Sequence, residues 1–445
     1  MNAIGALFTL VAVFYTFTLP REKVLFPLIL AALYMTRGQV LAIGPANFTI
    51  PQLLVTAGFL RARSRGEHIT DGLHTADKLL IGWAVLLVAD SAFHTPDAWV
   101  YRCGLVWTEL GCYFLYRTYI TDVADAMRVF KWICAVSVPL AVLMLVEKVT
   151  DHNVFGSLGG VVEYSLIRDG HVRAAGPFAH PILAGTTGTA IMALGLAVRK
   201  DSPRHTWLGF VGGGGIVMAA TSSGPIMMFI FILAALFAWR WRYRMKTVRW
   251  LLLSGVLLLN AVMHDPVYFL MARIDISGGS QGYFRAQLIR SSIEHLSEWW
   301  LAGTDWTRHW MASGNHANTN HTDITNQLLA EGVLGGLPLM AVYLAIVLRA
   351  FKDVGRALAQ HAQRPLAEQT LIWGLGALLF GYFMNYWTIS LFDQSVMFFY
   401  LCTASIQSIV RTHPLPAPSR SDERAAPPAV ARDRFLPSAQ GAVRK

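Results

Sequence analysis

Polar side chains that could do chemistry are concentrated between Gly303 and Asp323, directly before a long apolar segment. Several of them can ligate zinc, because imidazole and carboxylate are suitable ligands. They are His309, His316, His321 and Asp323. Their spacing matches no established zinc pattern, such as two helical histidines four residues apart around a glutamate. We therefore favour a histidine that acts as a general base, since imidazole can accept a proton near pH 7.

A second polar stretch carries Arg168, Arg173 and His180 immediately before another apolar segment. An arginine beside a membrane face can bind a phosphate through charge-assisted hydrogen bonds. The alternative for Arg173 is an anchor to lipid headgroups, where the long side chains of basic residues commonly lie. The sequence alone leaves both roles open.

The segments that hold these residues are apolar. Of the 445 residues, 54% are hydrophobic and 14% are charged, whereas a soluble domain carries about 25% charged residues. Most apolar stretches are roughly 15 to 22 residues long, enough for a helix to cross about 30 Å of hydrocarbon. Because a bilayer cannot satisfy exposed backbone groups, we predict an all-α bundle of about 12 or 13 transmembrane helices. The predicted segments are 3–19, 24–37, 47–60, 79–95, 99–116, 132–146, 181–198, 206–220, 225–239, 250–264, 323–348, 370–387 and 389–410.

The positions of Lys and Arg predict the orientation, because cytoplasmic loops collect basic residues. Basic clusters alternate along the chain with charge-poor connections, two of which are long and span about 147–180 and 265–322. Both polar stretches would then face the periplasm from a bacterial inner membrane. The net charge of +10 is mostly this topological signal, and we expect no nucleic-acid partner without a soluble basic domain. The clusters contain Arg61, Arg63, Arg65, Lys78, Arg117, Arg128, Lys131, Arg199, Lys200, Arg204, Arg240, Arg242, Arg244, Lys246, Arg249, Arg349, Lys352, Arg356 and Arg364.

The chain divides into a membrane domain, residues 1–411, and a tail, residues 412–445. The first apolar segment lacks a basic n-region and is followed by a second, so we expect a retained helix and not a cleaved signal peptide. The tail is rich in Pro, Ala and Arg, which predicts a disordered basic cytoplasmic extension. All cysteines fall in predicted spans, where we expect them to be apolar core residues.

The longer outer connection contains a predicted amphipathic helix between Gly282 and Leu296. Its apolar residues recur at helical spacing, and Arg290 and Glu294 are placed for an i,i+4 pair. Two interpretations are open. The helix could lie on the membrane surface, or it could cap the end of the bundle.

Several motifs follow one another along the chain in a recognisable order. Arg173-x-x-Gly-x-Phe-x-His-Pro181 opens one segment, and a Thr-Ser-Ser turn at 221–223 joins two later ones. Arg285 then precedes a long connection that ends at His321 and leads into Glu331-Gly-x-x-Gly335. This order resembles the O-antigen ligase and O-antigen polymerase superfamily, in which a His-Asn-x-x-Leu-like element leads into a Glu-Gly-x-x-Gly helix. The resemblance covers roughly residues 150 to 350 by motif.

The resemblance implies a metal-independent, inverting glycosyl transfer that uses no cofactor. The donor would be an oligosaccharide on undecaprenyl diphosphate, and the glycan acceptor would offer a sugar hydroxyl at the periplasmic face of the lipid bilayer. Carried onto this chain, the resemblance makes His321 the general base and Arg285 and Arg173 the diphosphate-binding residues. Support would come from Arg308, His309, Glu331, Asp323 and His180.

Two departures from the family pattern concern the acceptor. The turn continues as Ser223-Gly-Pro225 where ligases commonly carry an arginine, and His321 is followed by Thr-Asp instead of asparagine. Both departures favour a polymerase of exopolysaccharide or O-antigen repeat units. The alternative is an O-antigen ligase that attaches glycan to lipid A core. A chain-length regulator and a flippase would belong to the same pathway.

A secondary transporter is the alternative from another functional class. It would also have about a dozen spans, but with ionisable or broken-helix sites near the midplane. Here the predicted spans hold few ionisable groups, chiefly Asp90 and Glu109, while polar residues collect in the outer connections. The sequence therefore favours an enzyme over a transporter.

Overall fold

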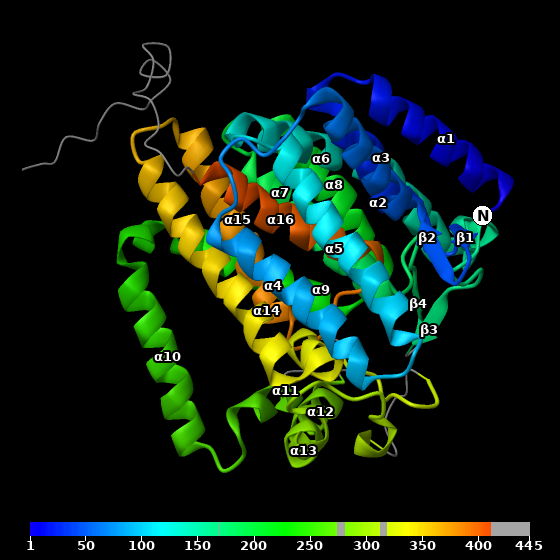
Figure 1. Ribbon diagram of the computed structural model, residues 1–445. Helices are drawn as coiled ribbons and strands as arrows, with labels where there is room; N and C mark the ends of the chain where they lie inside the picture. Colours follow the sequence, from blue (N-terminus) through cyan, green and yellow to red (C-terminus); the bar gives the residue numbers. More distant parts are fainter. Residues whose placement is uncertain (169, 274–280, 312–317, 411–445) are drawn as a thin grey trace, which may run out of the picture.

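The computed structural model describes residues 1–168, 170–273, 281–311 and 318–410, and these are mostly helical (Figure 1). Each apolar stretch predicted above contains a helix, but α6 begins at Val123 and α14 ends at Gln360, well beyond the predicted segments 132–146 and 323–348. The early helices are α1 (Ala3–Thr18), α2 (Leu25–Tyr34), α3 (Ile50–Arg65), α4 (Thr75–Ala89), α5 (Ala98–Tyr119), α6 (Val123–Thr150), α7 (Pro181–Ala197) and α8 (Pro203–Ala220). The later ones are α9 (Ser223–Phe237), α10 (Met245–Val262), α11 (Leu270–Arg273), α12 (Gly282–Glu294), α13 (Leu296–Trp299), α14 (Gln327–Gln360), α15 (Leu366–Asn385) and α16 (Val396–Ile409).

Two short antiparallel hairpins supplement the helices, so the all-α prediction is right for the bulk of the chain but omits them. They are β1 (Val40–Ile43) with β2 (Ala46–Thr49), and β3 (Leu166–Arg168) with β4 (His171–Arg173). The predicted tail at 412–445 lies outside the described residues.

Among the described residues, four helical stretches are long and apolar enough to cross a membrane. They are Val123–Thr150, Ser223–Val262, Gln327–Gln360 and Leu366–Asn385. Helices α1 and α7 are equally apolar in character but shorter. Helix α10 has no buried residue, and its leucines are exposed all round. So large an exposed apolar surface would be unfavourable in water, which indicates a membrane protein.

Small residues let α6, α7 and α8 pack closely at the centre of the bundle. A Cβ atom at Gly212 of α8 would lie 2.0 Å from Ser137 Oγ on α6. One at Gly213 would lie 2.3 Å from the carbonyl oxygen of Gly188 on α7. Such contacts are typical of helices that associate through small residues within a membrane. They fix the ends of α6, α7 and α8 relative to one another.

The two long connections lie at the same end of the bundle. Figure 1 shows β3 and β4 beside the lower ends of the helices, at the end where α11, α12 and α13 lie. At the other end an ion pair joins α6 to the connection between α7 and α8, with Lys131 Nζ 2.5 Å from an Asp201 carboxylate oxygen. This connection belongs to one of the basic clusters and lies opposite the polar stretches. The membrane orientation that the charge pattern favours stays a prediction.

Cysteine placement agrees with the sequence prediction at Cys112, Cys134 and Cys402, which are buried. The prediction is wrong for Cys103, which is exposed on α5. Tyr101 is also exposed, whereas Arg102 between them is buried, so Cys103 lies on an outward side of α5.

Candidate functional site

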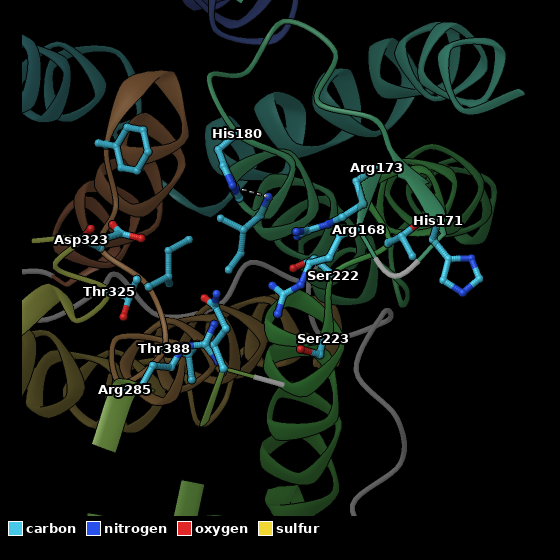
Figure 2. Close-up of a pocket in the computed structure, with 16 residues that line it drawn as sticks. Arg168, His171, Arg173, His180, Ser222, Ser223, Arg285, Asp323, Thr325 and Thr388 are labelled. Atoms are coloured by element: carbon cyan, nitrogen blue, oxygen red, sulfur yellow. Dashed lines mark hydrogen bonds between the residues drawn. The ribbon is translucent and has the colours of Figure 1, made fainter. Parts of the chain in front are cut away.

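A cavity of about 250 Å³ opens where β3–β4, α12 and the ends of several bundle helices meet. Arg168, Arg173 and Arg285 line it, and Asp323 is the one acidic side chain among its described lining residues. Figure 2 shows Arg168 and Arg173 on one side with Ser222, and Arg285, Asp323 and Thr388 on the other. Three guanidinium groups against one carboxylate make the cavity suited to an anion.

The register of the β3–β4 hairpin explains why its basic side chains share a wall. Leu166 pairs with Arg173 and Arg168 pairs with His171. Directly paired residues of antiparallel strands lie on the same face, as do residues two apart on one strand. Arg168, His171 and Arg173 therefore project from one face of the hairpin, and all three line the cavity.

The C-terminal turn of α6 anchors this hairpin. The buried carboxylate of Glu147 accepts hydrogen bonds from the backbone N–H groups of Ala175 and Gly176, each at 2.9 Å. Lys148 Nζ donates to the carbonyl oxygen of Val172 at 3.0 Å and also to the hydroxyl of Thr221. The same helix end thus fixes the hairpin and the turn that follows α8.

That turn contributes two hydroxyl groups to the cavity. Thr221 adopts a left-handed conformation with φ of 43°, which ends α8 and lets α9 begin at Ser223. Ser222 and Ser223 line the cavity at the first turn of α9. Unpaired N–H groups at a helix N-terminus carry partial positive charge, so this turn adds to the attraction for an anion. Close packing against this turn comes from Gly185 of α7, where a Cβ would lie 2.7 Å from Pro225, whereas a Cβ at Gly224 would lie no closer than 3.4 Å to its neighbours.

His180 lines the cavity as the N-cap of α7. Its Nδ1 accepts the backbone N–H of Ile182 at 3.2 Å. Burial, together with the charges of Arg173 and Arg168, lowers the pKa of His180 to about 4. The imidazole is therefore neutral near pH 7, with its proton on Nε2. In this state His180 can donate a hydrogen bond but is poorly placed to accept a proton.

Arg285 occupies the first turn of α12. Its Nε is buried and has no hydrogen-bond partner among the described residues. Burial lowers the pKa of Arg285 to about 10; Arg168 and Arg173 lower it too, while Asp323 raises it. A buried donor without a partner is costly, so a bound anion would stabilise this arrangement.

Asp323 faces these arginines from the segment before α14. Burial raises the pKa of its carboxyl group, and the charge of Arg285 lowers it. Two residues earlier, His321 is half-buried and does not belong to the residues that line the cavity. Its Nδ1 lies 3.4 Å from the hydroxyl of Thr307, and its backbone N–H donates to Asn318 Oδ1 at 2.7 Å.

No protein-family model and no curated protein matches this chain.

Other predicted residues do not line the cavity. Arg308 and His309 belong to the 3₁₀ helix η6 (Arg308–Met311) and do not line it. His309 instead lies 2.9 Å from Glu298. His316 lies outside the described residues.

Glu331 is buried beneath the start of α14. It accepts from Trp83 Nε1 at 2.9 Å and from Gln327 Nε2 at 2.8 Å. Gln327 Oε1 in turn accepts the backbone N–H of Leu391 at 2.6 Å. Thr388 and Phe392, on either side of Leu391, line the cavity. Glu331 therefore helps to hold this wall of the cavity in position.

The Glu-Gly-x-x-Gly pattern has a packing explanation. Trp299 lies so close to Gly332 that a Cβ there would be 2.5 Å from its ring. After Gly335 the chain leaves helical geometry, and Gly336 has φ of 71°. Arg102, buried on α5, donates to the carbonyl oxygen of Leu334 at 2.6 Å beside this break.

The structure thus brings Arg173, Arg285, His180 and Asp323 together. Sequence reasoning did not select Arg168, Glu147 or Gln327 for the site. A signal existed for Arg168, which lies in the same polar stretch as Arg173. One also existed for Glu147, an acidic residue at the end of an apolar helix, where unpaired charge is rare. The contacts of Gln327 join residues far apart in the sequence and leave no local pattern.

Proposed function

We propose that this chain transfers a glycan from an undecaprenyl-diphosphate donor to a sugar hydroxyl at the periplasmic face of a bacterial inner membrane. The observation that carries the proposal is the cavity with Arg168, Arg173 and Arg285, together with the buried Nε of Arg285 that lacks a partner. It lies at the end of an apolar helix bundle, where a diphosphate attached to a lipid would be presented. The motif resemblance supplies the donor class.

The diphosphate is the leaving group in this reaction. As the bond between the anomeric carbon and the phosphate oxygen breaks, its electron pair passes to the diphosphate, which gains negative charge. Guanidinium hydrogen bonds strengthen with that charge and so stabilise the transition state more than the ground state. The cluster of three arginines in one cavity supports this role, whereas lipid headgroup anchoring requires no enclosed site.

A general base must take the proton of the acceptor hydroxyl while its oxygen attacks the anomeric carbon from the face opposite the diphosphate. We assign this role to His321. Its Cα lies within about 7 Å of that of Asp323, since two residues span no more, so it lies near the cavity although it does not line it. Burial lowers the pKa of His321, and Asp305 raises it. The neutral base form is therefore favoured near pH 7. Asp323, which faces Arg285, is better suited to orient that arginine.

The acceptor determines whether the enzyme is a polymerase or a ligase. We favour polymerisation of exopolysaccharide or O-antigen repeat units, because the turn residues Ser222 and Ser223 line the cavity without the arginine that ligases commonly carry there. A flippase would deliver the donor, and a chain-length regulator would act on the product.

Complementation of a deletion strain tests the function. Wild type and the variants His321→Ala, Arg285→Ala and Arg290→Ala are expressed at equal abundance, and surface, secreted and carrier-linked glycans are resolved on gels. Arg290 is an exposed residue of the same helix, paired with Glu294 at 3.1 Å, and serves as the matched control. Single repeats in place of long chains would identify a polymerase, whereas long carrier-linked chains missing from lipid A core would identify a ligase. A normal profile in the His321 and Arg285 variants would refute the proposal.

A further inference from the structure

A second cluster of chemically capable side chains lies outside the cavity. His295 ends α12, Glu298 belongs to α13, and His309 belongs to η6. One ligand atom from each lies within 4.8 Å of the other two. None of the three lines the cavity. We infer that His295, Glu298 and His309 bind a divalent transition metal of the zinc class, a site independent of the proposed glycosyl transfer.

The donor set suits this chemistry. Zinc is held by imidazole nitrogen and carboxylate oxygen, and sites with three protein ligands complete a tetrahedron with water. Glu298 and His309 are partly exposed, with 36% and 39% of their side-chain surfaces accessible. This exposure admits an ion and leaves room for a water molecule as the fourth ligand. Calcium and magnesium would instead require mostly oxygen ligands.

Neighbouring hydrogen bonds orient two of the three ligands, His295 and Glu298. His295 Nδ1 lies 2.9 Å from the carbonyl oxygen of Ser291. A carbonyl can only accept, so Nδ1 carries the proton and the lone pair of His295 is on Nε2. Trp310 Nε1 donates to Glu298 Oε2 at 3.0 Å and holds the carboxylate. In metal centres, a ligand usually makes a further hydrogen bond of this kind to a neighbouring group.

Packing holds the ligands in place. The ring of Trp310 stacks on that of His295, with centroids 5.9 Å apart. Trp310 and Trp299 belong to a buried cluster with Leu288 and Leu329. The elements that carry the ligands therefore rest on one apolar core, and little conformational entropy remains to be lost when the ion binds.

A simple surface ion pair explains less of this geometry. Glu298 and His309, 2.9 Å apart, would suffice for an ion pair. His295 would then have no function in the cluster, although its ring centroid lies 5.0 Å from that of His309 and its Nε2 lone pair is available. Two imidazole nitrogens and one carboxylate oxygen around a common point form a suitable ligand set for a metal ion.

The ion would tie the α12–α13 junction to η6. The backbone N–H groups of Thr307 and Arg308 both donate to the carbonyl oxygen of Asn320, at 3.0 and 2.9 Å. A metal on His309 therefore stiffens the segment that leads to His321 and Asp323. The ion has a structural role and leaves the transfer reaction itself metal-independent.

Cobalt titration of the full chain tests the site. The protein is purified in detergent without a polyhistidine tag, stripped with a chelator, and titrated with Co²⁺ while its visible absorption is followed. We expect one Co²⁺ per chain, displaced by Zn²⁺. The variants His295→Ala, His309→Ala and the near-isosteric Glu298→Gln should weaken binding by more than about 10-fold. His264→Ala, at an exposed histidine of the same connection, should bind as wild type.

Thermal unfolding gives a second measurement. Zn²⁺ should raise the midpoint of wild type and of the His264 variant but not that of Glu298→Gln, because a ligand stabilises the state that binds it. Two results would overturn the site. One is the absence of saturable Co²⁺ binding by wild type, and the other is unchanged affinity in folded Glu298→Gln and His295→Ala. Either result leaves the proposed transfer reaction untouched.

Discussion

Arg285 is the residue whose surroundings favour a binding role most strongly over a structural one. A structural arginine in the interior is normally paired through its whole guanidinium group. Arg285 instead shares a cavity with two further arginines and one aspartate, and its Nε has no partner among the described residues. Such like charges repel one another, so the arrangement is most stable when an anion lies between them.

The protonation state of His321 gives a prediction at the same scale. A general base must be deprotonated, so the transfer rate should rise with pH through the pKa of His321 and then level off. Burial lowers this pKa from its usual value, with Asp305 opposing the effect, so the midpoint should lie below about 6.5. Initial rates of glycan transfer by isolated membranes across pH 4.5 to 8 measure it.

His180→Ala is the control for this profile. With a pKa of about 4, His180 is neutral over most of that range and should not affect the midpoint. His321→Gln should lower the transfer rate by about 100-fold or more. The remaining rate should no longer fall as the pH is lowered through the pKa of His321. A midpoint above about 6.5, or an unchanged fall of the rate at low pH in His321→Gln, would contradict the role of His321.

At the scale of elements, the break in α14 determines how the connection from α13 reaches the cavity. Gly336→Ala should destabilise the protein by about 1 to 3 kcal/mol, because a non-glycine residue is strained at positive φ. The added Cβ would also lie 2.4 Å from the backbone of Leu301. Thermal unfolding in detergent should show a midpoint several degrees lower.

Gly355→Ala provides the matched control on the same helix. No atom lies within 4 Å of a Cβ at this position. A glycine-to-alanine change inside a regular helix stabilises the folded protein by up to about 1 kcal/mol. The thermal unfolding midpoint should therefore be unchanged or higher. Equal midpoints for the Gly336 and Gly355 variants would show that the break is not required.

The anchoring of the β3–β4 hairpin by α6 gives a second prediction at this scale. Glu147→Ala removes the acceptor of two backbone N–H groups, at Ala175 and Gly176. Each buried donor without a partner costs about 1 to 3 kcal/mol, so the hairpin should lose its fixed position. We expect a lower unfolding midpoint and shorter or less glycan in the complementation assay. Glu163→Ala, at an exposed position of the same connection, should change neither.

For the whole molecule, periodicity and charge predicted the helices but not their mutual contacts. Every predicted apolar stretch is helical, because helix length and composition are local properties. The shared face of Arg168 and Arg173 depends on strand register, and the wall held by Gln327 depends on a contact with Leu391. Such pairings are decided by packing between distant segments, which single-sequence patterns do not encode. The break at Gly335–Gly336 was likewise hidden, since glycines in an apolar helix usually serve close packing.

The proposed topology can be tested by labelling substituted cysteines in intact cells. In a Cys103→Ser background, which removes the exposed native thiol, Ser157→Cys and Ser297→Cys should react with a membrane-impermeant maleimide. Lys200→Cys and Lys352→Cys, at exposed positions in the basic clusters, should react only after the inner membrane is permeabilised. Labelling of all four positions from the same side would contradict the orientation and place the cavity in the wrong compartment.

Binding of undecaprenyl diphosphate to the purified protein tests the central claim most directly. Affinities of wild type, Arg285→Ala and Arg290→Ala are compared in detergent by a fluorescence or native mass spectrometry assay. Loss of a charge-assisted contact of about 1.5 to 3 kcal/mol should weaken binding to Arg285→Ala by about 10-fold or more, while Arg290→Ala binds as wild type. Absence of binding to wild type, or equal affinity of the Arg285 and Arg290 variants, would contradict the claim that this cavity holds the diphosphate of the donor.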